Sequence, residues 1–143
     1  MPQRIIILCT GNSCRSQMAQ VIWQQLVGDR AQVESAGSAP SGYVHPLAIK
    51  ALQELKLPTD GLQSKSIEPF INQKIDLVVS VCDHAQQNCP VLPHVQQQLH
   101  WPFDDPAEAT GSEEEKMLVF RRVRDEIKQR ISEYVQAELR LPS

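Results

Sequence analysis

Cys9 and Arg15 are separated by five residues, at a point where an apolar run gives way to a helical pattern. Five residues between a strand and a helix can curl their backbone N–H groups around a tetrahedral oxyanion, and the helix N-terminus adds its partial positive charge. Arg15 can bind two oxygens of the same anion through its planar guanidinium. Cys9 would then lie at the floor of a cationic cup, where its thiolate is favoured and can attack the central atom.

The residues inside this loop have different expected roles. Gly11 allows the backbone to approach the anion closely, while Asn12 tolerates left-handed geometry and can brace the loop against Ser35. We expect Ser13 and Cys14 to contribute backbone amides. The Cys14 side chain is interpreted as structural, and a disulfide between Cys9 and Cys14 under oxidation stays open.

Two further groups of residues could complete the chemistry. An oxyanion bound to sulfur loses water or an alcohol more easily when the leaving oxygen is protonated, and Asp104 or Asp105 could supply that proton. An Asp-Pro pair alone is also an ordinary turn. Cys82 and Cys89 form a potential dithiol, which a two-electron reduction needs and simple hydrolysis does not. The alternative is that they are buried cysteines without a chemical role.

The elements that must position these residues alternate along the chain. We expect strands at 4–8, 32–35, 75–81 and 98–101, and helices at 14–27, from Pro46, around 67–71 and from Ser112. The last helix follows a capping-box pattern, Ser112-x-x-Glu115. This order predicts an α/β fold, a four-stranded parallel sheet with helices on both faces. Ligands bind at the carboxyl ends of such strands, where Cys9, Cys82 and the loop after Trp101 would converge.

Composition restricts the class of protein. The 143 residues suit one domain, 1–143, and the net charge of −3 argues against a nucleic-acid partner. The apolar run near the N-terminus is too short for a signal segment or a membrane span. Four cysteines in an apparently cytoplasmic chain indicate chemistry rather than structural disulfides. The four histidines have no metal-ligand spacing and are expected on the surface or in loops, and Arg121, Arg122 and Arg124 are expected on a solvated helix face.

Several stretches together resemble the low-molecular-weight tyrosine phosphatase fold, and most closely its thioredoxin-recycled arsenate reductases. The resemblance covers nearly the whole chain. It rests on residues 9–20, 81–90, 101–106 and 110–116, which include the Cys9 loop, both distal cysteines and the Trp-Pro-Phe-Asp-Asp-Pro run. That run selects Asp105 as the general acid and leaves Asp104 as a loop hydrogen-bonding residue.

The resemblance implies a complete reaction. Cys9 attacks arsenate, Asp105 helps to expel water, and Cys82 attacks the Cys9 sulfur so that arsenite leaves. Cys89 then forms a disulfide with Cys82, which thioredoxin reduces. The implied enzyme is a cytoplasmic monomer without cofactor or metal. The implied oxyanion-binding residues are Thr10, Gly11, Asn12, Ser13, Cys14, Arg15 and Ser16, with the Ser16 hydroxyl bonded to the thiolate.

Two other functions compete with this one. A low-molecular-weight tyrosine phosphatase would use Cys9 and Asp105 through a cysteinyl-phosphate. Such phosphatases usually carry an aromatic residue after Asp-Pro to flank the phenol ring, whereas Ala107 follows here. Weak hydrolysis of small aryl phosphates is still expected. A thiol redox sensor or binding module would leave Arg15 and Asp105 without a role.

Overall fold

The computed structural model describes residues 4–81 and 92–140. Its core is a four-stranded, fully parallel sheet, as the sequence predicts. The structure gives the strand order across the sheet as β2-β1-β3-β4. The central strand β1 pairs with β2 on one side and β3 on the other, so its carboxyl end lies between two neighbouring strand ends. The strands are β1 (Arg4–Cys9), β2 (Gln32–Gly37), β3 (Ile75–Ser80) and β4 (Val95–His100).

The side chains of β1 alternate between the two faces of the sheet, and both faces are buried. Ile5 and Ile7 belong to the apolar core that the sheet shares with the three α-helices. Ile6 and Leu8 pack on the opposite face, against a core that includes Phe70. Consecutive buried β-branched residues therefore mark a strand that is covered on both sides, as expected.

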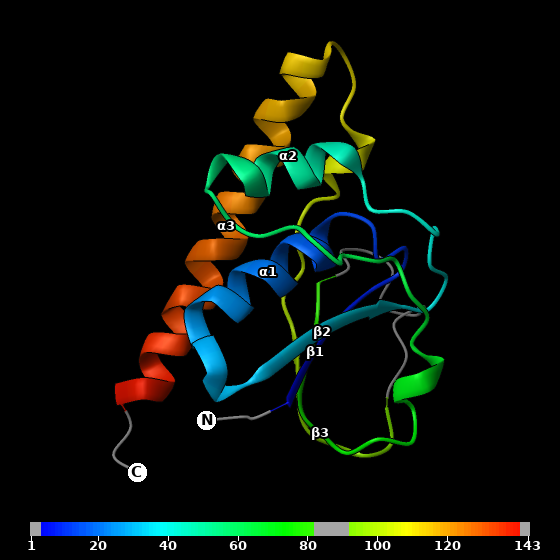
Figure 1. The fold of residues 1–143 in the computed structure, drawn as a ribbon, viewed down its shortest axis with the longest axis vertical. Helices are drawn as coiled ribbons and strands as arrows, with labels where there is room; N and C mark the ends of the chain where they lie inside the picture. The colour runs from blue at the N-terminus through cyan, green and yellow to red at the C-terminus, as the bar shows by residue number, and fades with distance from the viewer. Residues whose placement is uncertain (1–3, 82–91, 141–143) are drawn as a thin grey trace.

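Three α-helices pack together on one face, and Figure 1 shows α1 lying between α3 and the strands. Gly28 ends the first helix with φ at +61°, which glycine adopts at little cost. His45 caps the second, accepting the Leu47 N–H at 3.1 Å through Nδ1. The predicted capping box precedes the third, where Ser112 and Glu115 exchange two hydrogen bonds of 3.1 and 3.2 Å. The helices are α1 (Arg15–Val27), α2 (Pro46–Glu54) and α3 (Glu113–Arg140).

An arginine cluster joins α2 to α3, and it corrects one expectation. Arg122 is exposed as expected and Arg121 is partly exposed, but Arg124 is buried. The Arg124 guanidinium donates to the Ala51 carbonyl and to Glu54, each at 2.9 Å. Hydrogen bonds from Arg121 and Arg124 lower the pKa of Glu54 to about 2. The charge pattern on one helix could not reveal this, because the partners belong to another helix.

Strand β4 differs from its predicted bounds. It begins at Val95, three residues before the expected start at Gln98, and ends before Trp101. Because β4 is an edge strand, its glutamine side chains are exposed. This polar sequence gives no sign that the pairing with β3 begins as early as Val95, which lies opposite Ile75. The short helix expected around 67–71 is a 3₁₀ helix, Glu68–Phe70. Within the described ranges, no helix combines the length and apolar character that crossing a membrane requires.

Candidate active site

The loop between β1 and α1 holds the first candidate residues. Cys9 ends β1, Arg15 begins α1, and residues 10–14 connect them. The Cys9 side chain is a thiol with only 5% of the residue exposed. The parallel register places Cys9 beside Gly37 of β2. The predicted nucleophile therefore lies at the carboxyl edge of the sheet, next to a helix N-terminus.

The carbonyl groups of this loop are all held by the surrounding protein. The donors are the Ala39 N–H for Thr10 (3.0 Å), the Ser41 N–H for Gly11 (2.9 Å), the Gln17 side chain for Asn12 (2.9 Å) and the His45 N–H for Ser13 (3.0 Å). In a trans peptide the N–H points opposite to the carbonyl of the same unit, and no described peptide bond is cis. The N–H groups of residues 11–14 therefore point to the other side of the loop, as anion binding requires.

Asn12 braces the loop through every polar atom of its side chain. Its amide nitrogen donates to Ser16 Oγ at 2.8 Å and to Ser35 Oγ at 2.9 Å, and its Oδ1 accepts the Lys65 N–H at 2.9 Å. Its φ of +48° lies in the left-handed region. Both the geometry and the contact with Ser35 agree with the sequence-based prediction.

Arg15 joins this loop to the predicted general acid. Its Nη1 donates to the Phe103 carbonyl at 3.1 Å, and its Nη2 lies 3.6 Å from Asp105 Oδ2. The Arg15 side chain is only 9% exposed, so solvent screens this contact weakly. Asp105 also accepts the Ala107 N–H at 3.0 Å, which fixes the carboxylate at the start of a 3₁₀ helix, Pro106–Glu108.

The two adjacent aspartates have different surroundings. Asp104 is exposed and accepts a hydrogen bond of 3.1 Å from Arg122, as expected of a loop residue. Asp105 lies near Arg15 and near Cys14, whose Sγ is 4.0 Å from Asp105 Oδ1. Burial raises the pKa of the Cys14 thiol, and a neutral thiol agrees with the structural interpretation of that side chain.

Sequence reasoning missed three residues that support the loop. A side chain at Gly37 would place its Cβ 2.5 Å from the Thr10 carbonyl oxygen, so only glycine fits. Gln17 is fully buried and donates to the Asn12 and Gln63 carbonyls, and Ser64 Oγ donates to the Gly11 carbonyl at 3.0 Å. A glycine at a strand end was the one available signal. The contacts of Gln17 with Gln63 and of Ser64 with Gly11 span about fifty positions, and nothing in the sequence indicated either of them.

His45 lies in the loop that precedes α2, which agrees with the expectation for the histidines, and the structure adds a capping role for it. It is half-buried, caps α2, and its ring lies 4.8 Å from the Phe120 ring. Burial lowers the pKa of His45, which favours the neutral ring that the cap requires. His94 and His100 are exposed, and His84 lies outside the described residues. Among the residues described, no three His, Cys, Asp or Glu side chains gather as a metal site would require.

Cys82 and Cys89 lie outside the described residues, so their predicted roles are not tested. The residue before them is described. Val81 is buried, and its N–H donates to the carbonyl of Leu8, the residue before Cys9, at 2.9 Å. The chain therefore reaches position 81 alongside the end of β1.

Comparison with known proteins adds a family and several relatives. The family model described as low molecular weight phosphotyrosine protein phosphatase matches residues 4–141. A protein named arsenate reductase from Halalkalibacterium halodurans is 48% identical over 132 residues, which cover 92% of this chain and 94% of that protein. A protein of the same name from Bacillus subtilis is 47% identical over the same shares. A solved structure described as an arsenate reductase in the phosphate binding state aligns with a TM-score of 0.79 at 29% identity, covering 94% of this chain and 98% of that one.

Proposed function

The chain belongs to the low molecular weight phosphotyrosine protein phosphatase family, and we propose that it is a member that reduces arsenate to arsenite. The observation that carries this proposal is the loop from Cys9 to Arg15, in which the surrounding protein binds the carbonyls of residues 10–13, so that the N–H groups of residues 11–14 point to the opposite side. The relatives named arsenate reductase match nearly the whole chain and support the choice of substrate.

Residues 10–16 are the proposed oxyanion site. The N–H groups from Gly11 to Cys14 and the N-terminus of α1 bind the arsenate oxygens, together with Thr10 at the edge of the loop. Arg15 binds two oxygens through its guanidinium. The Ser16 hydroxyl already accepts a hydrogen bond from Asn12 at 2.8 Å, so its own proton is left to donate to the Cys9 sulfur.

In the proposed first step the Cys9 thiolate attacks arsenic and a sulfur–arsenic bond forms. One arsenic–oxygen bond breaks, and Asp105 supplies a proton so that the oxygen leaves as water. The position of Asp105, 3.6 Å from Arg15, supports this role because Arg15 binds the same anion. Arsenic stays in the +5 state at this stage, because no electrons have yet been transferred.

The two electrons come from the proposed cysteine relay. The Cys82 thiolate attacks the Cys9 sulfur, a Cys9–Cys82 disulfide forms, and the sulfur–arsenic bond breaks with its electron pair left on arsenic. Arsenite, with arsenic in the +3 state, then departs. Cys89 attacks Cys82, which frees Cys9 as a thiolate and leaves a Cys82–Cys89 disulfide. The hydrogen bond from Val81 to Leu8 supports this path, because it holds the chain before Cys82 alongside the strand end before Cys9.

An external dithiol must return the Cys82–Cys89 disulfide to its reduced form. We assign this role to thioredoxin, which transfers two electrons by the same exchange chemistry. A cycle that needs three reduced cysteines requires a reducing compartment, so the cytoplasm is the proposed location. The proposed steps use one copy of the chain, without a metal or cofactor.

Hydrolysis of small aryl phosphates is the expected side activity, since the loop offers the same contacts to phosphate as to arsenate. The exposed Ala107 provides no ring to flank a phenol, which disfavours tyrosyl substrates. Phosphate hydrolysis needs Cys9 and Asp105 and makes no use of Cys82 or Cys89.

The test is single-turnover arsenite release from fully reduced protein that carries one serine substitution. We expect no arsenite from Cys9→Ser or Cys82→Ser, because each lacks a sulfur that must bond before arsenic can depart. Cys89→Ser should release one equivalent and then stop as the Cys9–Cys82 disulfide. Hydrolysis of p-nitrophenyl phosphate is the control, and it should survive in Cys82→Ser and Cys89→Ser.

Steady arsenate turnover by Cys82→Ser with thioredoxin would contradict the relay. Wild-type protein that hydrolyses phosphate but never releases arsenite would instead favour the phosphatase. Thiol titration after one turnover of wild type gives an independent count, and two thiols should be lost per arsenite formed.

A further inference from the structure

The segment that carries Asp105 runs along α3. We call residues 101–105 the acid loop. At its start, the Trp101 ring is stacked on the Trp23 ring, with the two centroids 5.4 Å apart. The guanidinium carbon of Arg130 lies over the Trp101 ring, 5.1 Å from its centroid. Near its end, Asp104 accepts a hydrogen bond of 3.1 Å from Arg122. The acid loop is therefore held at both ends by arginines of one helix.

The spacing of these contacts matches the two backbones. Arg122 and Arg130 are eight positions apart, which is about 12 Å along an α-helix. Trp101 and Asp104 are three positions apart, which is about 10 Å of extended chain. The first loop residue meets the later helix residue, so the acid loop runs antiparallel to α3. Because the two spacings are similar, two arginines that lie two turns apart on α3 can contact both ends of the acid loop without a bend in either backbone.

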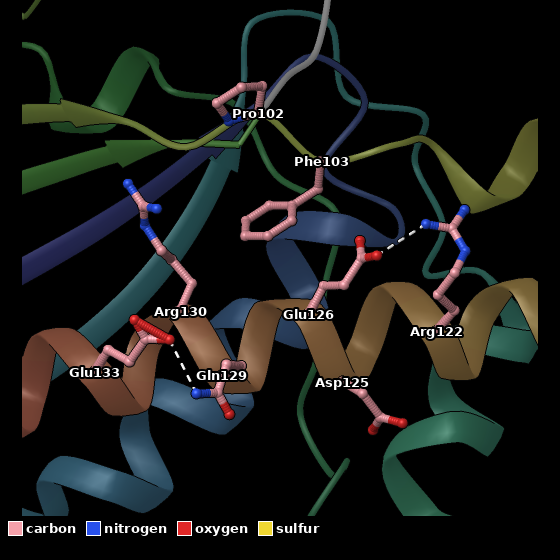
Figure 2. A pocket seen from close by; sticks show the side chains of 8 residues that line it. All are labelled: Pro102, Phe103, Arg122, Asp125, Glu126, Gln129, Arg130 and Glu133. Carbon is pink, nitrogen blue, oxygen red and sulfur yellow. Dashed lines mark hydrogen bonds and ion pairs between the residues drawn. The ribbon is translucent and has the colours of Figure 1, made fainter.

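Glu126 lies midway between the two arginines, and its Oε2 accepts from Arg122 Nη1 at 3.0 Å. Figure 2 shows these three side chains along one face of α3, with the Phe103 ring pointing toward the helix between Arg130 and Glu126. The Phe103 carbonyl is the group that accepts from Arg15. The contacts of α3 and the contact with Arg15 therefore act on one short stretch of chain.

We propose that Arg122 and Arg130 are positioning residues that hold the acid loop on α3 and so set where Asp105 delivers its proton. The proposal rests on the proposed function, because it assigns the loop's position to the proton-transfer step. We call residues 9–15 the anion loop. Arg122 contacts neither Asp105 nor the anion loop in the described structure, so it would act through Asp104, the neighbour of Asp105.

The energies involved favour an effect on chemistry over one on folding. Arg122 and Asp104 are 47% and 71% exposed, and exposed ion pairs contribute little to stability. A small displacement of a catalytic group, in contrast, can lower a rate by one or two orders of magnitude. Losing this clamp should therefore change catalysis while leaving the global fold intact.

The experiment compares Arg122→Gln, Arg130→Gln and the matched control Arg121→Gln. Arg121 is on the same helix and is similarly exposed, but it binds Glu54 of α2 at 2.7 to 3.1 Å. We expect kcat for arsenate reduction to fall about tenfold in the first two variants, less than the ~10²–10⁴ of losing the general acid itself. The kcat of the Arg121→Gln control should stay within about twofold of the wild-type value.

A second readout follows proton delivery itself. The ratio of p-nitrophenyl phosphate to phenyl phosphate turnover should rise in Arg122→Gln, because p-nitrophenolate leaves readily without a proton and phenolate does not. The Ala107 amide, which donates to Asp105, should exchange with solvent faster in the same variant. Arg122→Lys should recover part of the lost rate, since its single charge can bind Asp104 but lacks the planar fork.

The double variant Arg122→Gln with Asp104→Asn should be no slower than the slower single variant, because both changes break the same contact. The inference is overturned if Arg122→Gln and Arg121→Gln match in phosphate ratio and in Ala107 exchange. Wild-type protein that yields no arsenite would count against the proposed function alone, because both of these readouts remain measurable without arsenate.

Discussion

Arg15 and Asp105 are ninety positions apart in the chain, yet Arg15 Nη2 lies 3.6 Å from Asp105 Oδ2. The same guanidinium donates to the Phe103 carbonyl at 3.1 Å, so it holds both the proposed general acid and the chain that leads to it. An arginine that begins a helix at the anion loop therefore brings the proposed acid to the place where an anion would bind. The proposed chemistry depends on this contact.

The Asp105→Asn variant should lose about 10²–10⁴-fold in kcat for arsenate reduction, since an amide cannot deliver the proton that water needs to leave. The amide oxygen can still accept the Ala107 N–H, so the fold should be retained. Steady-state kinetics measure the loss of kcat, and a thermal melt checks that the fold is retained. Asp104→Asn is the neighbouring comparison and should lose only about as much as Arg122→Gln, because it breaks the same contact. Equal losses in Asp104→Asn and Asp105→Asn would contradict the choice of Asp105.

Replacing Gly37 with alanine should damage the anion loop. The added Cβ would lie 2.5 Å from the Thr10 carbonyl oxygen and 2.9 Å from that of Cys9, and backbone atoms cannot move aside easily. We expect a loss of about 1 to 3 kcal/mol in unfolding free energy and weaker binding of phosphate as a competitive ligand. Urea denaturation and phosphate titration measure these. The exposed neighbour Ser38→Ala should change neither.

Asn12 combines a left-handed backbone with three side-chain hydrogen bonds. The Asn12→Ala variant should lose about 2 to 4 kcal/mol of unfolding free energy, because it removes these bonds and because alanine tolerates the left-handed region less well than asparagine. The Asn12→Gly variant removes only the bonds. In chemical denaturation, the unfolding free energy of Asn12→Gly should therefore exceed that of Asn12→Ala by about 1 kcal/mol. Equal stability of the two variants would show that backbone geometry is not limiting.

The Glu54 contact predicts a pH dependence of stability. Hydrogen bonds from Arg121 and Arg124 lower its pKa from 4.5 to about 2. A lowered folded-state pKa contributes stability that is present above pH 4.5 and disappears as the pH falls toward 2. The Glu54→Gln variant should be less stable than wild type by about 1 kcal/mol at pH 7, a modest value because the side chain is 31% exposed.

Denaturation from pH 7 to pH 2 measures this difference, and the two stability curves should approach each other as the pH falls from 4.5 toward 2. The exposed Glu108→Gln variant should follow wild type throughout. A gap between wild type and Glu54→Gln that persists unchanged to pH 2 would exclude ionisation of Glu54 as its source.

The successful sequence predictions rest on short-range signals. The consecutive apolar residues of β1, the five-residue spacing from Cys9 to Arg15 and the capping box at Ser112 each lie within one or two elements. Such patterns act through local backbone geometry, so they can be read without knowing the fold. The parallel direction of the strands followed from the alternation of strands and helices along the chain, and the structure confirms it.

The failures came from positions whose surroundings are supplied by distant parts of the chain. Arg124 is a charged residue on a polar stretch of helix, yet Ala51 and Glu54 of another helix bury and pair it. The edge position of β4 exposes its glutamines, and the prediction therefore missed the first three residues of that strand. The assigned roles of Cys82 and Cys89 stay predictions, since both residues lie outside the described structure.

The sequence by itself determined the chemistry proposed for this protein, because a cysteine, an arginine and a helix start lie within seven residues of one another. Only the tertiary structure decided what surrounds that chemistry. The outward binding of the loop carbonyls, the fit of Gly37 and the approach of Asp105 to Arg15 all join residues that are far apart in the chain. Such contacts exist only after the sheet has formed, because its strand ends bring those residues to one edge.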